Sequence, residues 1–224
     1  MEKEFLKEIK AVQSADTYTA FFDMLYMAMS EINYWQDKNT ASYLGLNTAR
    51  YQGKDKEHLS NAFAYVMMMM EEHANKRNFY DVLGRLFHVL ELHNQDRGQF
   101  FTPQHLADLL ASLGADIETL KERNVLTVCE PAVGAGANVL GLCNYLMKLG
   151  YNPQQVLRVE ACDVDIRCVT MCYLQMTLYG IPAKIIHGDT LRMVENKTFY
   201  TPWWMMNRGF HLKQIKNFKV SHPA

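Results

Sequence analysis

The fold is decided by residues 125–149, VLTVCEPAVGAGANVLGLCNYLMKL. The stretch begins with a short apolar run rich in β-branched residues, which predicts a strand, and ends with a helix-like run from Ala137 to Leu149. Between them lies a turn that contains Gly134 and Gly136. Because glycine has no Cβ, such a turn adopts tight dihedrals and a ligand approaches it closely, facing the free N–H groups of the next helix. This order of elements is typical of a nucleotide-like cofactor site.

The strand predicted over Val125–Cys129 is followed by two more, over Val156–Cys162 and Lys184–His187. Helices are predicted between them, over Ala137–Leu149 and Ile166–Tyr179. Strands that alternate with helices favour an α/β fold with a parallel sheet and covering helices.

Residues 1–95 are predicted to be almost entirely helical, because apolar side chains recur there every three or four positions. This spacing occurs in Phe5–Ile9, Phe21–Ile32 and Leu83–Leu90. A polar, glycine-containing span from Asp37 to Lys56 is predicted to be a loop, and helix is predicted to resume around Glu57. We therefore predict a helical N-terminal region of residues 1–95 and an α/β domain of residues 96–224.

The composition is that of an ordinary globular protein, with 49% hydrophobic and 21% charged residues. No apolar run is long enough to cross a bilayer and the N-terminus lacks the layout of a secretory signal, so we expect a cytoplasmic protein. The five cysteines have no paired metal-ligand spacing, which predicts free thiols and no metal site.

The formal net charge of −1 means that any contact with nucleic acid depends on a local basic face. One candidate segment is the tail, where basic residues alternate with phenylalanines, although a solvated terminal segment explains the same pattern equally well. That segment contains Arg208, Phe210, Lys213, Lys216, Phe218 and Lys219.

A second signature, GQFFTP, occupies residues 98–103 ahead of the predicted strands. Thr102 offers a hydroxyl and a backbone N–H to a carboxylate, and Pro103 begins a predicted helix over Gln104–Leu113 whose N-terminal dipole favours an anion. The same residues also fit a helix start without a ligand, with Thr102 as the N-cap. Beside the glycine-rich turn, we favour the ligand-binding interpretation.

Acidic residues follow the second and third predicted strands. Asp163 comes directly after Cys162, where a carboxylate accepts hydrogen bonds from both ribose hydroxyls in many nucleotide-binding sheets. Asp165 is the second candidate, because it lies two residues further on and on the same side of a continuing strand. Either aspartate also fits as the N-cap of the helix near Ile166. Asp189 follows the third strand in an ordinary Gly-Asp turn.

Taken in order, the Phe-Thr-Pro segment, an acidic-Pro-x-x-Gly-x-Gly turn, a second acidic residue and a Gly-Asp turn resemble the N-6 adenine DNA methylase family, including the modification subunits of type I restriction systems. The resemblance covers about Gly98 to Leu191 and implies a Rossmann-like methyltransferase fold that binds S-adenosylmethionine. The residues that it assigns to this cofactor are Phe101, Thr102, Pro103, Glu130, Pro131, Gly134, Gly136, Asp163 and Asp189.

The resemblance also implies a role for each part of this set. The Phe-Thr-Pro segment folds over the methionine end of the cofactor, and Glu130 accepts from the ammonium group or orders the water around it. The two glycines leave room for the sulfonium end. Asp163 binds the ribose, and Asp189 accepts from the exocyclic amine of the adenine.

Adenine methylases of this kind also carry an Asn/Asp-Pro-Pro-aromatic motif that contacts the target amine and stacks on the flipped base. Nothing in this sequence matches it. Asn152-Pro153 lies before the second strand, on the wrong side of the cofactor loop. The nearest downstream substitute keeps one proline and the aromatic character, although its tryptophans also fit the end of a hydrophobic core. That substitute consists of Thr201, Pro202, Trp203 and Trp204.

About 35 residues follow Asp189, whereas a complete seven-stranded methylase core needs several more strands. We therefore expect an incomplete sheet, which the tail, the N-terminal helices, a second subunit or another copy of the chain completes. The favoured function is S-adenosylmethionine-dependent methylation of adenine N6 in DNA, in a restriction-modification context. The alternatives are a catalytically inactive relative that acts as a partner subunit or decoy, and a methyltransferase with a non-DNA substrate.

Overall fold

The computed structural model describes residues 1–90 and 102–206. These residues fall into two compact units, one made of residues 1–72 and 82–90 and the other of residues 73–81 and 102–206. The predicted boundary between residues 95 and 96 lies outside the described residues, as do Phe101 and the basic tail. Each unit has its own architecture.

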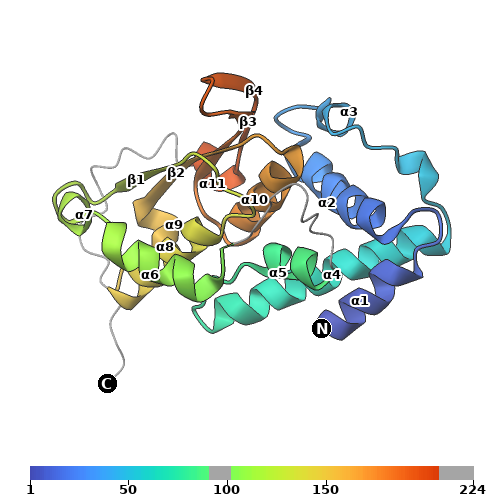
Figure 1. Cartoon of the computed structure of the whole chain (residues 1–224), viewed down its shortest axis with the longest axis horizontal. Coiled ribbons are helices and arrows are strands. Elements are labelled where there is room, and N and C mark those ends of the chain that lie inside the picture. Colours follow the sequence, from blue (N-terminus) through green and yellow to red (C-terminus); the bar gives the residue numbers. More distant parts are fainter. Residues whose placement is uncertain (91–101, 207–224) are drawn as a thin grey trace. The chain divides into compact units, whose positions relative to one another are not determined.

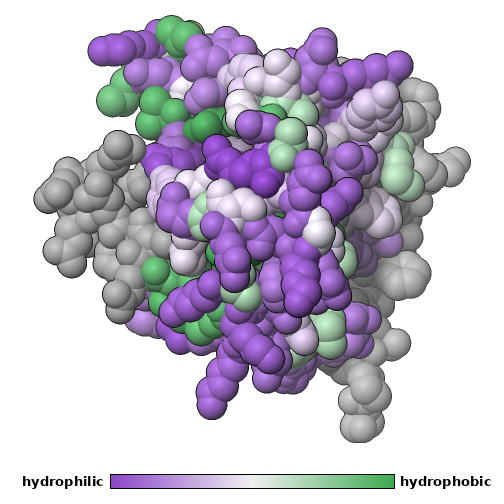
Figure 2. Space-filling model, turned by 90° about the vertical axis from the view of Figure 1, so that its right-hand side faces the viewer, coloured by the Kyte–Doolittle hydropathy of each residue, from purple (hydrophilic) through white to green (hydrophobic). Residues whose placement is uncertain are grey.

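The first unit is helical, as its apolar periodicity predicts (Figure 1). At its core the ring centroid of Phe21 lies 6.3 Å from that of Phe5 and 6.3 Å from that of Phe87. Burying a side chain of this size contributes roughly 1.5–3 kcal/mol. The face of the molecule shown in Figure 2 is mostly hydrophilic, with hydrophobic residues in separate patches. The helices are α1 (Glu2–Ala11), α2 (Thr17–Asn33), α3 (Thr40–Tyr43), the 3-10 helix η1 (Thr48–Arg50), α4 (Lys54–Asn75), whose last residues from His73 on belong to the second unit, and α5 (Val82–Val89).

The span from Asp37 to Lys56 is less irregular than the sequence predicts. It contains α3 and η1, and α4 begins at Lys54 rather than near Glu57. The start of α3 is held by a local buried contact, in which the side-chain amide of Asn33 donates to the hydroxyl of Thr40 over 2.8 Å. Helices of three or four residues are too short to produce an apolar periodicity, so the sequence pattern does not reveal them.

Within the described residues of the second unit, four strands form one sheet in the order β1-β2-β3-β4 (Figure 1). The strands are β1 (Leu126–Glu130), β2 (Leu157–Asp163), β3 (Ala183–Asp189) and β4 (Val194–Tyr200). The first three are parallel, and β4 pairs with β3 in the antiparallel direction. The helices are α6 (Gln104–Gly114), α7 (Ile117–Arg123), α8 (Ala137–Lys148), α9 (Pro153–Val156), α10 (Ile166–Leu178) and α11 (Pro202–Met206).

The α/β fold, the three parallel strands and the helices between them confirm the sequence prediction, with ends shifted by one or two residues. The strand β4 was not predicted. Its sequence is VENKTFY, and among its residues only Phe199 is buried, so it lacks the apolar signal of an interior strand. It forms because the chain turns back after β3 and pairs with that strand's backbone, from Lys184 opposite Tyr200 to Asp189 opposite Val194.

The two faces of the sheet differ in polarity. On β2, Val159 and Ala161 are buried, whereas Arg158 and Glu160 are partly exposed. Connections between neighbouring parallel strands are generally right-handed, which places the connecting helices α8 and α10 over one face. The helix α10 contacts both β2 and β3. On the other face, Lys184 forms an ion pair with Glu160 across 3.4 Å. The helices therefore cover the apolar face.

The helices α6 and α8 cross in close contact. A Cβ on Gly141 of α8 would lie 2.6 Å from the backbone carbonyl of Ala107 on α6, which is too close for any side chain. Glycine therefore allows the two backbones to touch. The contact anchors α6, and with it the Thr102-Pro103 segment at its start, against the helix that follows the glycine-rich turn.

Among the described residues, no helix combines the length and the apolar character needed to cross a membrane.

Candidate functional site

The glycine-rich turn connects the end of β1 to the start of α8. Gly134 has a φ of +57° and Gly136 a φ of +108°, in the left-handed region that glycine tolerates best. Gly136 is the N-cap of α8, and a Cβ at this position would lie 3.1 Å from Cε of Met176 on α10. The backbone at both glycines therefore adopts the tight dihedrals that the sequence predicts, whereas the close approach of a ligand stays a prediction.

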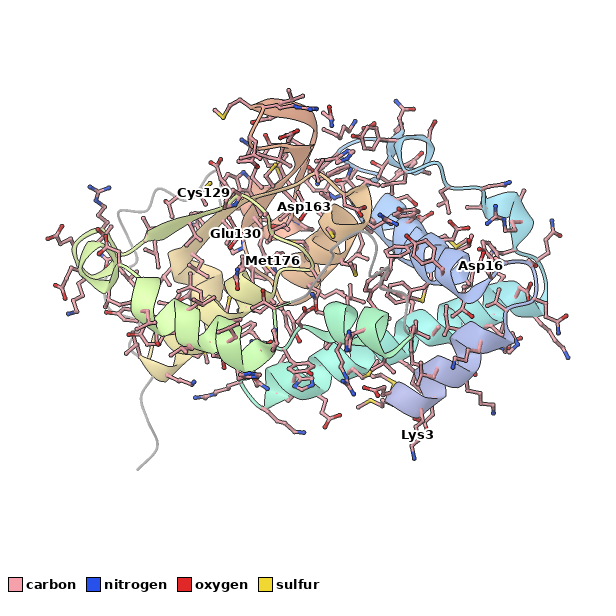
Figure 3. All side chains as sticks on the ribbon, viewed as in Figure 1. Lys3, Asp16, Cys129, Glu130, Asp163 and Met176 are labelled. Carbon is pink, nitrogen blue, oxygen red and sulfur yellow. The ribbon has the colours of Figure 1, made fainter. Side chains whose placement is uncertain are left out.

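Asp163 ends β2 and bonds directly to this turn. Its Oδ2 accepts from the backbone N–H of Gly134 over 2.9 Å, and its Oδ1 accepts from the N–H of Asp165 over 2.9 Å. Burial raises the pKa of the Asp163 carboxyl, although the hydrogen bonds from Asp165 and Gly134 act in the opposite direction. Figure 3 shows Asp163, Glu130 and Met176 gathered around the loop that follows β1.

Asp165 is the helix cap, the second of the two roles that the sequence allows for Asp163 and Asp165. It is the N-cap of α10, where its carboxylate accepts from the backbone N–H of Arg167 over 2.9 Å and pairs with the Arg167 guanidinium. A carboxylate at a helix N-terminus is favoured by the helix dipole. Asp165 therefore caps the helix, and Asp163 is the residue that meets the turn.

Further hydrogen bonds connect the loops at the carboxyl ends of all three parallel strands. The backbone N–H of Val133 donates to the carbonyl of Cys162 over 2.9 Å, and the hydroxyl of Thr190 donates to the carbonyl of Pro131 over 2.7 Å. Asp189 accepts from the backbone N–H of Arg192 over 3.1 Å and remains partly exposed. The loops that carry Gly134, Asp163 and Asp189 therefore converge at one edge of the sheet.

Glu130 at the end of β1 lies beside an acceptor with no partner among the described residues. Its Oε2 accepts from the side-chain amide of Asn138 over 3.2 Å, whereas Oδ1 of that same Asn138 is buried without a hydrogen bond. Both residues line a cavity of about 350 Å³ between α6, β1 and α8. A buried acceptor without a partner is costly, so this corner suits a ligand that donates hydrogen bonds.

Thr102 and Pro103 lie at the start of α6. Pro103, with a φ of −58° and a ψ of 141°, is the N-cap residue, and α6 begins at Gln104. The expectation that proline starts the helix is therefore shifted by one position, and Thr102 is not the N-cap. The Thr102 hydroxyl is therefore not the cap of the helix, and its role in ligand binding stays a prediction.

Two buried residues that the sequence analysis did not single out connect this segment to the turn. Gln175 on α10 donates from Nε2 to Oδ1 of Asp81 over 2.7 Å and to the carbonyl of Ala135 over 2.8 Å. The backbone N–H of Asp81 donates to Oε1 of Gln104 over 3.1 Å. No local pattern indicates these contacts, because Asp81 and Gln175 are 94 residues apart.

The structure does not bring the Thr201–Trp204 segment to this edge. Thr201 follows β4, whose antiparallel pairing places it beside Ala183 at the amino end of β3. Its buried hydroxyl accepts from the N–H of Ala183 and donates to the carbonyl of Ile181, each over 2.9 Å. Trp204 stacks on Tyr200 with ring centroids 6.2 Å apart. These contacts are those of a structural segment.

Among the described residues, no group of histidine, cysteine or acidic side chains is arranged to hold a metal ion.

Comparison with known proteins identifies the family. The family model described as N-6 DNA Methylase matches residues 78–214, which is more than half of the chain. The matched region begins at the segment that contains Asp81 and includes the glycine-rich turn and all four strands. No curated protein and no solved structure matches the chain.

Proposed function

Because the chain belongs to the N-6 DNA methylase family, we propose that it binds S-adenosylmethionine at the carboxyl edge of its sheet and forms the donor-binding part of a DNA adenine-N6 methyltransferase. The observation that carries the proposal is the hydrogen bond from Gly134 to Asp163, which joins the glycine-rich turn to the acidic residue of the neighbouring strand. A nucleoside that uses both features must lie across these two strand ends.

The polar groups around β1 fit the methionine end of this cofactor. Glu130 is an acceptor, and so is Oδ1 of Asn138, which has no partner in the part of the chain that the structure describes. An ammonium group supplies three donors. Glu130 and Asn138 line the cavity between α6, β1 and α8, whose α6 wall consists of residues between Ala107 and Gly114. In this proposal the Thr102-Pro103 segment covers the amino-acid end of the donor.

The groups around Asp163 fit the nucleoside end. Each carboxylate oxygen already accepts one backbone N–H, and each has a second lone pair for a ribose hydroxyl. Two apolar side chains follow the acidic residues and remain exposed, Val164 at 68% and Leu191 at 97%. Exposed apolar side chains beside a polar group are suited to contact the faces of a base. Asp189, two residues before Leu191, would then accept a hydrogen bond from the exocyclic amine of the adenine.

S-adenosylmethionine supplies a methyl group on a positively charged sulfur. The residues of this chain bind and orient that donor, so that an incoming amine approaches the methyl carbon in line with the bond to sulfur. No covalent intermediate with the protein is needed. The chain therefore contributes by positioning the donor and by electrostatic interactions with it.

The groups that contact the target adenine must come from elsewhere. The sequence has no Asn/Asp-Pro-Pro-aromatic motif, and among the described residues β1 is the parallel strand at one end of the sheet, with β4 at the other. An unpaired edge of a parallel sheet is usually covered. We propose that a second subunit or another copy of the chain pairs along β1 and supplies the groups that contact DNA. The missing motif also favours a second candidate function, that of an inactive partner subunit or decoy.

Two measurements test the proposal. In titration calorimetry of the full chain, S-adenosylmethionine and S-adenosylhomocysteine should bind saturably at one site, whereas NAD, which carries the same adenosine, should not. A chain that binds neither sulfur compound would overturn the donor-binding proposal. Transfer of labelled methyl groups to unmethylated DNA, with the chain alone and with candidate partner subunits, separates the enzyme from the decoy.

A further inference from the structure

The Gln175 side chain is a buried junction between three parts of the second unit. The residue is fully buried on α10, and its amide nitrogen donates one hydrogen bond to Asp81 and one to the carbonyl of Ala135. An amide nitrogen carries two hydrogens, so both of its donors are used. The direction of each bond is therefore set by the plane of a single amide group.

The peptide group between Ala135 and Gly136 is held from both sides. The carbonyl of Ala135 accepts from Gln175, and the N–H of Gly136 donates to the carbonyl of Val133 over 2.9 Å. The two groups point in opposite directions across one planar unit, so together they prevent it from rotating. The glycine-rich turn thus has a fixed conformation despite two residues with positive φ.

Asp81 extends the junction to the start of α6. Its carboxylate, in a residue that is 7% exposed, accepts from Gln175, and its backbone N–H donates to the side chain of Gln104. Gln104 is the first residue of α6 and follows Thr102 and Pro103. Three hydrogen bonds therefore connect the two segments that the proposed function places at the methionine end of the donor.

We propose that Asp81 and Gln175 are positioning residues, which fix the separation between the Thr102-Pro103 segment and the glycine-rich turn and so preform the donor site. This inference rests on the proposed function for its role in binding, although the connection itself is independent of any ligand. Neither side chain contacts the donor in this scheme. Their effect on affinity is transmitted through the backbone of the turn and the start of α6.

The primary test is Gln175→Met, which keeps the volume and removes both donors. Hydrogen exchange of the backbone amides from Gly134 to Gly136, measured without ligand, should accelerate by about tenfold, the equivalent of one lost hydrogen bond. The Kd for S-adenosylmethionine in titration calorimetry should rise by a similar factor. The matched control is Thr170→Val, which removes a buried hydroxyl from the same helix, where it bonds only the carbonyl of Ile166 over 2.9 Å among the described contacts.

Thr170→Val should leave both readouts at wild-type values once exchange is corrected for global stability measured by urea unfolding. Equal exchange in the turn of the two variants would overturn the proposal. Hydrogen exchange needs no ligand, so it tests whether Gln175 holds the turn even if the wild-type chain binds no S-adenosylmethionine. Absence of binding would overturn only the proposed function.

A second pair of variants separates the hydrogen bond from the charge. Asp81→Asn keeps a side-chain oxygen that accepts from Gln175, and should leave exchange in the turn close to wild type. Asp81→Leu has no acceptor and should behave like Gln175→Met. If Asp81→Asn loosened the turn as much as Asp81→Leu, the assignment to this hydrogen bond would be wrong.

Discussion

The backbone N–H of Gly134 donates to the carboxylate of Asp163 over 2.9 Å, so the turn after β1 and the end of β2 are one hydrogen-bonded unit. This places an acidic side chain over the glycine-rich turn before any ligand is present. Asp165, two residues along, instead caps α10. The two aspartates therefore have separable roles, and this difference is open to experiment.

Replacing each aspartate should give opposite outcomes. Asp163→Ala should raise the Kd for S-adenosylmethionine by at least about a hundredfold, because two hydrogen bonds to a charged group are each worth about 1.5–3 kcal/mol. Asp165→Ala should leave the Kd within about threefold of wild type but lower the free energy of unfolding by about 1 kcal/mol, through loss of the helix cap. Titration calorimetry and urea unfolding measure the two effects. Equal losses of affinity would contradict the assignment.

The pH dependence of binding should reflect the raised pKa of Asp163. Burial favours the protonated carboxyl, so its pKa in the folded protein lies above the ordinary aspartate value. The ionised form is the one that accepts from both ribose hydroxyls. We therefore expect the affinity for S-adenosylhomocysteine, whose sulfur is uncharged, to fall as the pH drops through this raised pKa, at a less acidic pH than an ordinary aspartate would give. Calorimetry over a series of acidic buffers checks this.

Gly136→Ala should destabilise the second unit. The new Cβ would lie 3.1 Å from Met176 and would hold alanine at a φ of +108°. Strain of this kind costs about 1–3 kcal/mol. Shortening the neighbour in the double variant with Met176→Ala should relieve the contact but not the backbone strain, and Met176→Ala alone supplies the reference. Urea unfolding of the three variants separates the two contributions, and a wild-type stability for Gly136→Ala would contradict the backbone assignment.

Thr201→Val tests whether the segment after β4 is structural. The substitution leaves the N–H of Ala183 and the carbonyl of Ile181 buried without their partner, at a cost of about 1–3 kcal/mol for each group. The unfolding free energy should fall, while the Kd for S-adenosylmethionine should stay at the wild-type value. A stable variant that loses methyl transfer to DNA would instead return Thr201 to the acceptor site.

Asp55 predicts an acid-sensitive first unit. Its carboxylate accepts from the hydroxyl and the backbone N–H of Ser14 and from the N–H of Gln13, and these bonds lower its pKa. A depressed folded-state pKa gives stabilisation that is present above the unfolded-state pKa and is lost as the pH falls through the folded-state value. Asp55→Asn should therefore be less stable than wild type near neutral pH.

The difference between wild type and Asp55→Asn should close as the carboxyl becomes protonated in strong acid. Thermal unfolding followed by circular dichroism at neutral and acidic pH measures this difference. Glu57→Gln removes an exposed carboxylate from the same helix and controls for the change in net charge. A difference that stayed constant with pH would show that the hydrogen bonds to Asp55 do not depend on its charge.

The parallel strands and their helices were predictable because their signals are local. Val159 lies in a stretch of alternating apolar and polar residues and Ile185 beside a second isoleucine, while Gly134 and Gly136 mark the turn between a strand and a helix. The strand β4 was not predictable, since Glu195 and Lys197 carry no strand pattern and the strand exists only by pairing with β3. The helix α3 was not predictable for another reason, because four residues are too few to show an apolar periodicity.

The order of the motifs along the chain was sufficient to determine the family and the set of loops that meet at the carboxyl edge, because neighbouring parallel strands bring their carboxyl ends to the same edge. Only the tertiary structure decided that Asp163 rather than Asp165 bonds to the turn, and that Thr201 lies at the amino end of β3. It also decided that Gln175 donates a hydrogen bond to the carbonyl of Ala135. Backbone preferences act over a few residues, whereas a buried hydrogen bond forms between whichever groups the packed sheet and helices bring within reach.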